Sequence, residues 1–325
     1  MRNFTFKGQL LTAVFMLLGC LSIQAANDDL ITKQITINLD KAGTLPNKIA
    51  SSEMYKITNL KIIGEINGTD WNMIREMAGR DNRGYGTEGK LSVLDLSEAK
   101  IVKGGDSYYP GDNCYTSNDE IGEKAFTDCS RLTSLTLPVG ITSIGYDAFA
   151  YCSGLTSLTL PAGITSIGEY AFSGCSGLTS LTLAGITSID KYAFSGCSRL
   201  TSLTLPAGIT SIGEFAFSYC SGLTSIYVYA EKVPRIGSYA FEGCASRKCT
   251  LYVPKGTYDN YRLSEFGYFE NIVEFDATGI DKTTTSTDVE EVSRYSLNGQ
   301  RLAVPVKGLN IVKYSDGSVK KVVVL

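Results

Sequence analysis

The sequence predicts a solenoid that is mainly β-structure, because one unit of about 23 residues recurs along the middle of the chain. Its Ala-Phe pair places a phenylalanine at Phe126, Phe149, Phe172, Phe194, Phe217 and Phe241. A cysteine follows each of them in step, at Cys129, Cys152, Cys175, Cys197, Cys220 and Cys244. Each unit also contains Leu-x-x-Leu-x-Leu, and this motif at a period in the low twenties is typical of a leucine-rich-repeat solenoid.

Composition and charge exclude several classes of function. Of the 325 residues, 43% are apolar and 19% charged, so the chain can bury a core. The net charge is -3 without a basic cluster, and binding of nucleic acid needs a positive field around the phosphates. The chain contains no histidine, which removes the Ser-His-Asp and Cys-His nucleophile systems and most catalytic zinc sites. We expect no nucleic-acid partner, no cofactor and no enzyme of these types.

Residues 1–25 are predicted to be a secretory signal peptide. Arg2 and Lys7 supply the positive start, and 10–21 is a short apolar run. A transmembrane helix needs about 20 apolar residues, so this run is too short for a stable span. Cys20 follows Leu-Leu-Gly, which resembles a lipobox, so an alternative is a lipid anchor at Cys20. Both routes export the protein.

Residues 26–89 are predicted to form an N-terminal cap with early degenerate repeats. An open solenoid end exposes a cross-section of the core, so the terminal units must differ from the others. The segments 34–39 and 57–66 have strand-like patterns. Asp70 is placed to cap a helix whose apolar face contains Trp71.

The segment 102–120 interrupts the repeats and is predicted to be a loop. It contains Tyr108, Tyr109 and Tyr115 among Gly, Pro, Asp and Asn. Insertions in repeat proteins fall in loops, and such loops often carry function. The three tyrosines are therefore candidate ligand contacts, with local packing in an ordinary surface loop as the alternative.

Each regular unit between residues 121 and 254 is predicted to form two short strands joined by a turn. In Ser-Leu-Thr-Leu, as at 134–137, a period of two directs the leucines inward and the hydroxyl side chains outward. Gly-Ile-Thr-Ser-Ile, as at 163–167, forms the second extended stretch, and the Ala-Phe pair lies in a short helical or 3-10 turn. Stacked units then give two parallel strand ladders.

The core Ile-Gly-x-x-Ala-Phe-x-x-Cys-x-x-Leu-Thr-Ser-Leu resembles the BspA-like leucine-rich repeat family of bacterial proteins. The resemblance covers 121–254 strongly and 57–101 loosely. It implies a secreted or surface-exposed module associated with adhesion to host matrix proteins and to other bacteria. The family's Val-Pro-x-Gly-x-x-x-x-Tyr ending matches 253–261. The motif residues are structural, so the resemblance transfers no ligand contact.

The C-terminal part is predicted to contain a cap, a linker and a small β-tail. Aromatic residues in 254–274 are expected to form a helical plug over the last coil of the solenoid, which extends over 90–275. The polar, threonine-rich segment 276–291 is a linker. In 292–325, Asn-Gly and Asp-Gly pairs indicate two hairpins. This tail resembles C-terminal sorting domains of Gram-negative secretion pathways, although Asn310 departs from the aromatic residue often found there; a module that stays attached is the alternative.

The cysteine positions favour buried free thiols. Equivalent residues in adjacent coils lie about 5 Å apart, but their side chains point the same way, which is poor disulfide geometry. Export permits disulfides at two outlying pairs, Cys114–Cys129 and Cys244–Cys249. CxxC pairs and histidines are absent from the sequence, so zinc is disfavoured.

The outward hydroxyl rows are the remaining candidate surface. The candidate contacts on the core strands are Thr136, Thr159, Thr182 and Thr204. Tyr227 and Tyr229 replace hydroxyl side chains near the end of the array, and aromatic anchors are common in interfaces. The alternative is that short polar residues only solvate a strand face.

The sequence therefore predicts a non-enzymatic, exported adhesion or interaction module, located outside a Gram-negative outer membrane or secreted. The expected partners are a host extracellular matrix or surface protein, a glycan, or other bacterial cells. The alternatives are a secreted hydrolase of polysaccharide that uses Asp/Glu pairs, and a purely structural spacer in the cell envelope.

Overall fold

A computed structural model of the chain describes residues 29–109, 111, 113–277, 291–295, 301–302, 308–314 and 319–324. The chain divides into two compact units, one ending at Glu274 and one beginning at Phe275. The predicted signal peptide, 1–25, and its Cys20 lie outside the described residues. The domain limits inferred from the sequence remain predictions.

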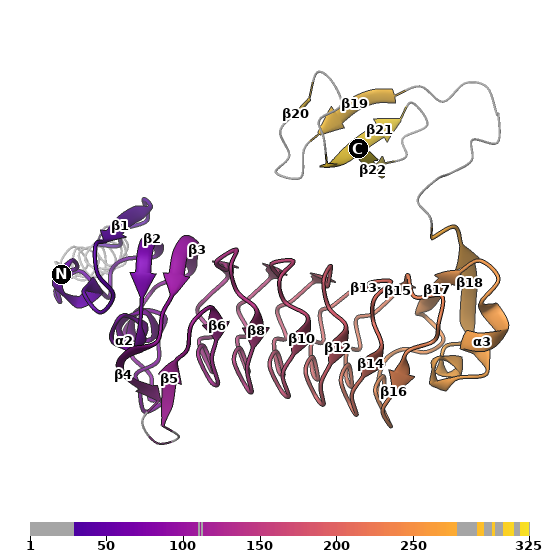
Figure 1. The fold of residues 1–325 in the computed structure, drawn as a ribbon, viewed down its shortest axis with the longest axis horizontal. Coiled ribbons are helices and arrows are strands. Elements are labelled where there is room, and N and C mark those ends of the chain that lie inside the picture. Colours follow the sequence, from indigo (N-terminus) through magenta and orange to yellow (C-terminus); the bar gives the residue numbers. More distant parts are fainter. Residues whose placement is uncertain are drawn as a thin grey trace, which may run out of the picture. The chain divides into compact units, whose positions relative to one another are not determined.

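Ten strands of the described chain form the main sheet of the solenoid (Figure 1). In sheet order they are β1 (Ile35–Leu39), β2 (Asn59–Ile66), β3 (Val93–Ile101), β7 (Ser134–Thr136), β9 (Ser157–Thr159), β11 (Ser180–Thr182), β13 (Ser202–Leu205), β15 (Ser225–Val228), β17 (Thr250–Pro254) and β18 (Asn271–Phe275). From β1 to β17 each pair is parallel. In repeat strands such as β9 and β13, outward Ser and Thr alternate with buried Leu because side chains alternate between the two faces.

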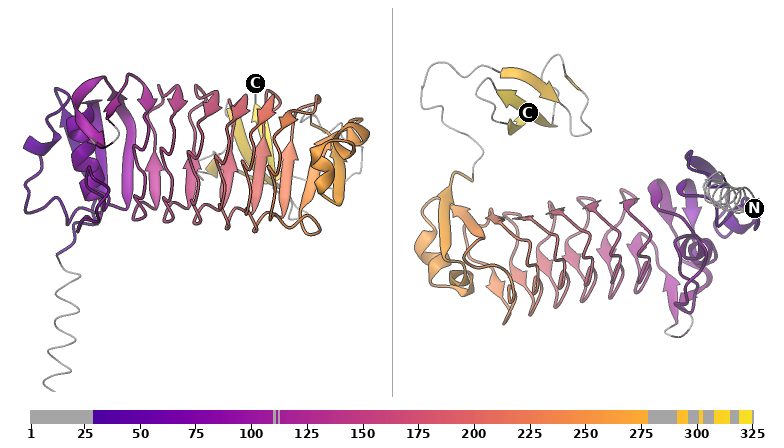
Figure 2. Two further views of the ribbon diagram at one scale, coloured as in Figure 1. Left: turned by 90° about the horizontal axis from the view of Figure 1, so that it is seen from below. Right: turned by 180° about the vertical axis from the view of Figure 1, so that it is seen from behind.

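A second parallel ladder contains six short strands of the described chain. They are β6 (Glu120–Ile121), β8 (Ser143–Ile144), β10 (Ser166–Ile167), β12 (Ser188–Ile189), β14 (Ser211–Ile212) and β16 (Arg235–Ile236). Figure 2 shows the two ladders stacked coil by coil along one axis. The predicted fold class, a leucine-rich-repeat solenoid with about 23 residues per coil and parallel ladders, is confirmed.

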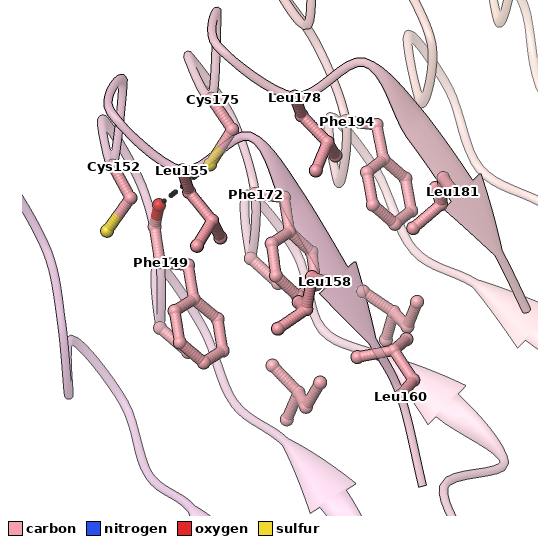
Figure 3. Close-up of a cluster of buried hydrophobic side chains, with 14 of the residues drawn as sticks. Phe149, Cys152, Leu155, Leu158, Leu160, Phe172, Cys175, Leu178, Leu181 and Phe194 are labelled. Atoms are coloured by element: carbon pink, nitrogen blue, oxygen red, sulfur yellow. Dashed lines mark hydrogen bonds between the residues drawn. The ribbon is translucent and has the colours of Figure 1, made fainter. Parts of the chain in front are cut away.

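The core between the ladders is a stack of repeated side chains (Figure 3). The phenylalanine ladder comprises Phe126, Phe149, Phe172, Phe194, Phe217 and Phe241. Ring centroids of neighbours lie 4.9–5.5 Å apart, and their planes differ by 11° or less. Each cysteine thiol from Cys152 to Cys244 donates to the phenylalanine carbonyl of the preceding coil at 3.0–3.4 Å. The predicted inward positions are therefore confirmed.

The Ala-Phe turn differs from the helical or 3-10 turn expected there. Its residues form hydrogen-bonded turns. Two residues in the turn of each coil have positive φ, as at Tyr192 (55°) and Gly196 (74°). A right-handed helix cannot include such residues. Alternate N–H groups of the turn donate to carbonyls of the next coil, and we call this set of bonds the turn ladder. Within the array, Tyr192, Phe194 and Gly196 donate to the carbonyls of Glu214, Ala216 and Ser218.

Gly196→Ala is expected to lower the free energy of unfolding by about 1 kcal/mol, because an L-residue at this φ is strained. Space is available, since an added Cβ would meet no heavy atom closer than 3.7 Å. Urea unfolding of the variant measures the loss. Gly208→Ala is the matched control, because Gly208 has an ordinary φ and open surroundings. Equal stability of the two variants would show that the positive φ at Gly196 does not strain an alanine there.

The N-terminal cap is built around α2 (Gly68–Met77), which begins after Asn67. Asn67, not Asp70, is the N-cap residue; Asp70 is the third helical residue and completes a capping box with Asn67. The short helix η1 (Leu45–Asn47) and a hairpin of β4 (Gly104–Tyr109) and β5 (Cys114–Thr116) pack against α2. Trp71 and Ile74 of α2 are fully buried.

The C-terminal cap contains α3 (Tyr258–Arg262) and η3 (Glu265–Tyr268). Phe266 and Phe269 pack on Phe241, the last ring of the phenylalanine ladder. The hydroxyl of Tyr261 donates to the Ala230 carbonyl at 2.5 Å. Tyr261, Phe266 and Phe269 are buried in the expected plug, whereas Tyr258 and Leu263, which were also expected there, are 42% and 88% exposed.

The tail unit contains an antiparallel sheet in the order β20-β19-β21-β22. Its strands are β19 (Glu291–Tyr295), β20 (Arg301–Leu302), β21 (Gly308–Tyr314) and β22 (Val319–Val324). The predicted pairing of the last two strands is confirmed by the register from Gly308↔Val324 to Lys313↔Val319. Both predicted hairpin turns, and residues 278–290 of the predicted linker, lie outside the described residues.

Candidate functional site

The outward side chains of the main sheet are aligned in one row by the strand register. We call it the strand-face row. From β2 to β17 it holds Lys61, Asp95, Thr136, Thr159, Thr182, Thr204, Tyr227 and Tyr252. Thr136 and Thr159 are exposed and Thr204 is half-buried; Thr182 is placed by its backbone register, and its side chain lies outside the described atoms. The structure therefore brings together five of the nine sequence candidates, the four threonines and Tyr227.

The two ends of the strand-face row differ in chemistry. At the N-terminal end, the Lys61 ammonium lies 2.6 Å from Glu98 Oε1 and 3.5 Å from Asp95 Oδ2. The hydrogen bond to Glu98 raises the pKa of Lys61. Partial burial opposes ionisation of Asp95, but hydrogen bonds from Ser97 and the Lys61 charge hold its pKa below the usual value. One ammonium thus faces two carboxylates, so this end of the row keeps an excess of one negative charge, partly screened by solvent.

At the C-terminal end, the row finishes in two stacked tyrosines. The rings of Tyr227 and Tyr252 lie with centroids 4.4 Å apart and planes within 6°. Both are half-buried, and partial burial is the main cause that raises the pKa of Tyr227. Tyr229, which directly follows β15 and lies two residues after Tyr227, is 37% exposed. Tyr252 was missed by the sequence reasoning, although Leu-Tyr-Val at 251–253 repeats Ile-Tyr-Val at 226–228.

The tyrosines of the interrupting segment do not join this row. Tyr108 is fully buried, and its hydroxyl donates to the Glu123 carbonyl at 2.8 Å. Its proposed role as a ligand contact is therefore wrong, because the ring is packed in the cap against Trp71. Tyr109 is half-buried, with the Arg75 guanidinium 5.3 Å from its ring centroid. Tyr115, which is 53% exposed, lies on the separate β4–β5 sheet.

The N-terminal cap uses these side chains to complete the turn ladder. In every later coil, the carbonyls equivalent to those of Glu123 and Ala125 accept hydrogen bonds from N–H groups of the preceding coil. In the first coil, Tyr108 bonds the Glu123 carbonyl, while Trp71 Nε1 and Arg75 Nη1 bond the Ala125 carbonyl at 2.9 and 3.0 Å. Burial of an unpaired carbonyl is costly, so these side chains replace a missing coil. Their function is structural.

Among the hollows of the described chain, one follows the second ladder and another lies in the N-terminal cap. A shallow groove of about 530 Å³ follows β10, β12, β14 and β16 and includes Asp190, Lys191 and Arg235. An open hollow of about 740 Å³ in the N-terminal cap lies between η1 and α2, and polar groups that include Lys48, Glu76 and Asp106 line it together with apolar side chains. Burial, together with the nearby Asp81 charge, raises the pKa of Glu76. Neither hollow was foreseen from the sequence.

Comparison with protein families identifies the repeat. The family described as BspA type leucine rich repeat region matches residues 119–249 in six copies. Residues 119–249 are a BspA-type leucine-rich repeat region.

Solved structures also match parts of this chain. A leucine rich repeat protein of Treponema pallidum is 29% identical, with a TM-score of 0.37, over 42% of this chain and 62% of that one. A leucine rich cell surface protein of Faecalibacterium prausnitzii is 23% identical, with a TM-score of 0.34, over 68% of this chain and 51% of that one. The alignments thus span less than two thirds of either of these two proteins. No curated protein matches the chain.

The cysteines of the BspA-type repeats are buried free thiols, and no disulfide joins the cysteines of the described chain. Burial raises the pKa of Cys129 to about 11 and that of Cys175 to about 12. A thiol reacts and binds metal as its thiolate, so these residues are inert at neutral pH. Neither outlying pair of the described chain, Cys114 with Cys129 or Cys244 with Cys249, is joined by a disulfide.

Two further features concern the described part of the chain. No set of three or more Cys, Asp or Glu side chains within the described ranges is arranged to hold a metal ion. No helix in those ranges has both the length and the apolar character that a bilayer span requires.

Proposed function

We propose that this protein is an exported, non-enzymatic interaction module that binds a protein or glycan through the strand-face row of its BspA-type repeats. The observation that carries the proposal is the stacked pair Tyr227–Tyr252 at the end of a row of hydroxyl side chains. The expected partners are a host extracellular matrix or surface protein, a glycan, or other bacterial cells. The predicted signal peptide supports secretion or display on the cell surface.

The chemistry of the row suits noncovalent recognition. Stacked, half-buried tyrosines offer a rigid apolar surface with polar hydroxyls, and such residues lose little conformational entropy on binding. Thr136 and Thr159 add exposed donors and acceptors on the same face. Because consecutive coils hold these groups at a fixed spacing, a ligand that spans several coils can contact all of them.

The double variant Tyr227→Ala/Tyr252→Ala is expected to weaken ligand binding by about tenfold or more, because buried aromatic anchors dominate interface energies. Ligands are first selected by exposing the full-length protein to arrays of purified glycans and extracellular-matrix proteins, and affinities are then measured by calorimetry. Tyr151→Ala/Tyr219→Ala is the matched control, since both tyrosines are exposed on the turns and lie outside the row.

Three results would contradict this function. If a ligand binds both double variants as tightly as the unchanged protein, the strand-face row is not its binding site. No ligand in either array would favour a structural spacer. Turnover of a polysaccharide, lost on Glu76→Gln in the cap cavity, would favour the hydrolase alternative instead.

A further inference from the structure

The turn ladder has a direction, with N–H groups at one edge of every coil and carbonyl groups at the other. In the last complete step, the N–H groups of Phe215, Phe217 and Tyr219 donate to the following coil. The acceptors are the carbonyls of Ser238, Ala240 and Glu242, at 3.1, 2.8 and 2.6 Å. The three acceptors belong to alternate residues of one peptide segment. Every turn before the last therefore donates to the backbone of the coil that follows it.

The two ends of the turn ladder are treated differently. At the N-terminal end, side chains of the cap occupy the carbonyls of Glu123 and Ala125. At the C-terminal end, the equivalent donors are the N–H groups of Tyr239, Phe241 and Gly243. Within the described chain, these three groups donate no hydrogen bond.

The C-terminal cap covers the last coil with apolar groups but supplies no acceptor to these donors. Phe266 and Phe269 pack on the Phe241 ring. The Tyr268 hydroxyl is itself a donor, to the Cys244 carbonyl at 2.8 Å. An edge of unpaired N–H groups is a template for another backbone, as at the edge of a sheet.

A pocket of about 510 Å³ lies at this edge, lined by 236–242 together with Glu265 and Tyr268. Two of its three aromatic residues are accessible, Tyr239 being 63% and Tyr268 43% exposed, whereas Phe241 is buried. The ionisable side chains that line it, apart from the tyrosines, are Glu242 and Glu265; no Lys or Arg is among them. The pocket thus combines backbone donors, aromatic walls and negative charge.

We propose that the C-terminal edge of the turn ladder binds a basic peptide segment of a partner protein. Backbone carbonyls of alternate residues in that segment accept the N–H groups of Tyr239, Phe241 and Gly243, as the next coil does elsewhere in the array. A Lys or Arg of the segment lies against Glu242 and Glu265, and its apolar side chains pack on the exposed tyrosines. This is recognition by backbone addition, with the pocket supplying specificity.

The surroundings favour this occupant over the other candidates. Aligned N–H groups also attract anions, but Glu242 and Glu265 repel them. A second copy of the chain would have to offer the carbonyls of its first coil, and its own cap already occupies those of Glu123 and Ala125. The site is separate from the strand-face row, so it does not depend on the function proposed for that row.

Random decapeptides displayed on phage are selected against the full-length protein to test the proposal. We expect the enriched peptides to carry Lys or Arg and to bind Glu242→Lys/Glu265→Lys at least tenfold more weakly. The control is Glu53→Lys/Glu169→Lys, which makes the same change of charge at distant positions and should leave the affinity unchanged. On the unchanged protein, the peptides should shift the backbone amide resonances of Tyr239, Phe241 and Gly243.

The amide shifts on the unchanged protein keep the test decisive even if the lysine variant fails to fold. Absence of any enriched peptide would overturn the proposal. Peptides that leave the three amides unshifted would do the same. If glycans shift these amides and peptides do not, the edge binds sugar hydroxyls and the assignment to a peptide partner is wrong. Failure of the arrays at the strand-face row has no bearing on these outcomes.

Discussion

Phe194→Ala is expected to lower the free energy of unfolding by about 3–5 kcal/mol, the range for truncating a buried phenylalanine. Phe194 is fully buried in the middle of the phenylalanine ladder. Its ring stacks between Phe172 and Phe217, with centroid distances of 5.1 and 5.2 Å and interplanar angles of 2° and 4°. Two coils therefore lose a packing partner at once, and the cavity cannot close without shifting a whole coil.

Urea unfolding followed by circular dichroism measures this loss for the whole solenoid. The matched control is Phe215→Ala, because Phe215 stacks between Tyr192 and Tyr239 at similar distances but is half-exposed. Its truncation should cost about 1 kcal/mol, the contribution of an aromatic pair with little cavity. If both variants unfold at the same urea concentration, the phenylalanine ladder is not the main source of stability in the array.

The ladders and their inward residues could be predicted from the sequence because burial in a solenoid repeats with the sequence. A residue such as Leu158 or Phe172 has the same environment in each coil, so its type recurs at a fixed interval. The turn could not be read in the same way. Its conformation is set by hydrogen bonds to the next coil, such as Phe172 N–H to the Ala193 carbonyl. These bonds hold Tyr170 at a φ of 57°, against its local preference.

The candidate site was predicted only in part, for reasons that differ between residues. Tyr108 was misplaced because its role depends on the coil that is missing before Glu123, which no local pattern shows. Tyr252 was missed because the preceding segment is longer, placing it 25 residues after Tyr227 instead of about 23. The unpaired N–H groups at the Tyr239 edge likewise depend on where the array of coils ends. Periodic reasoning thus works within the array and fails where the array stops.

Asp70→Ala is expected to lower the free energy of unfolding by about 3–5 kcal/mol, because removing a buried carboxylate leaves several buried donors unpaired. Asp70 is fully buried and accepts from the backbone N–H groups of Gly43, Leu45 and Asn67 at 2.6, 2.8 and 3.0 Å. It thereby ties the loop before η1 to the first turn of α2. An exposed carboxylate on the same cap provides the control: Asp106→Ala removes only a bond from the Thr69 hydroxyl and should cost less than about 1 kcal/mol.

The loss in Asp70→Ala should appear first in the N-terminal cap, where the chain's single tryptophan reports it directly. Trp71 adjoins Asp70 in α2 and donates to the Ala125 carbonyl of the first coil. Release of α2 removes this bond together with the Arg75 bonds to the same coil, so the end of the array becomes unpaired. We expect the fluorescence transition of Trp71 to move to lower urea ahead of the circular dichroism of the array. If the fluorescence and circular dichroism transitions of Asp70→Ala coincide, and do so at the urea midpoint of Asp106→Ala, then Asp70 does not hold the cap in place.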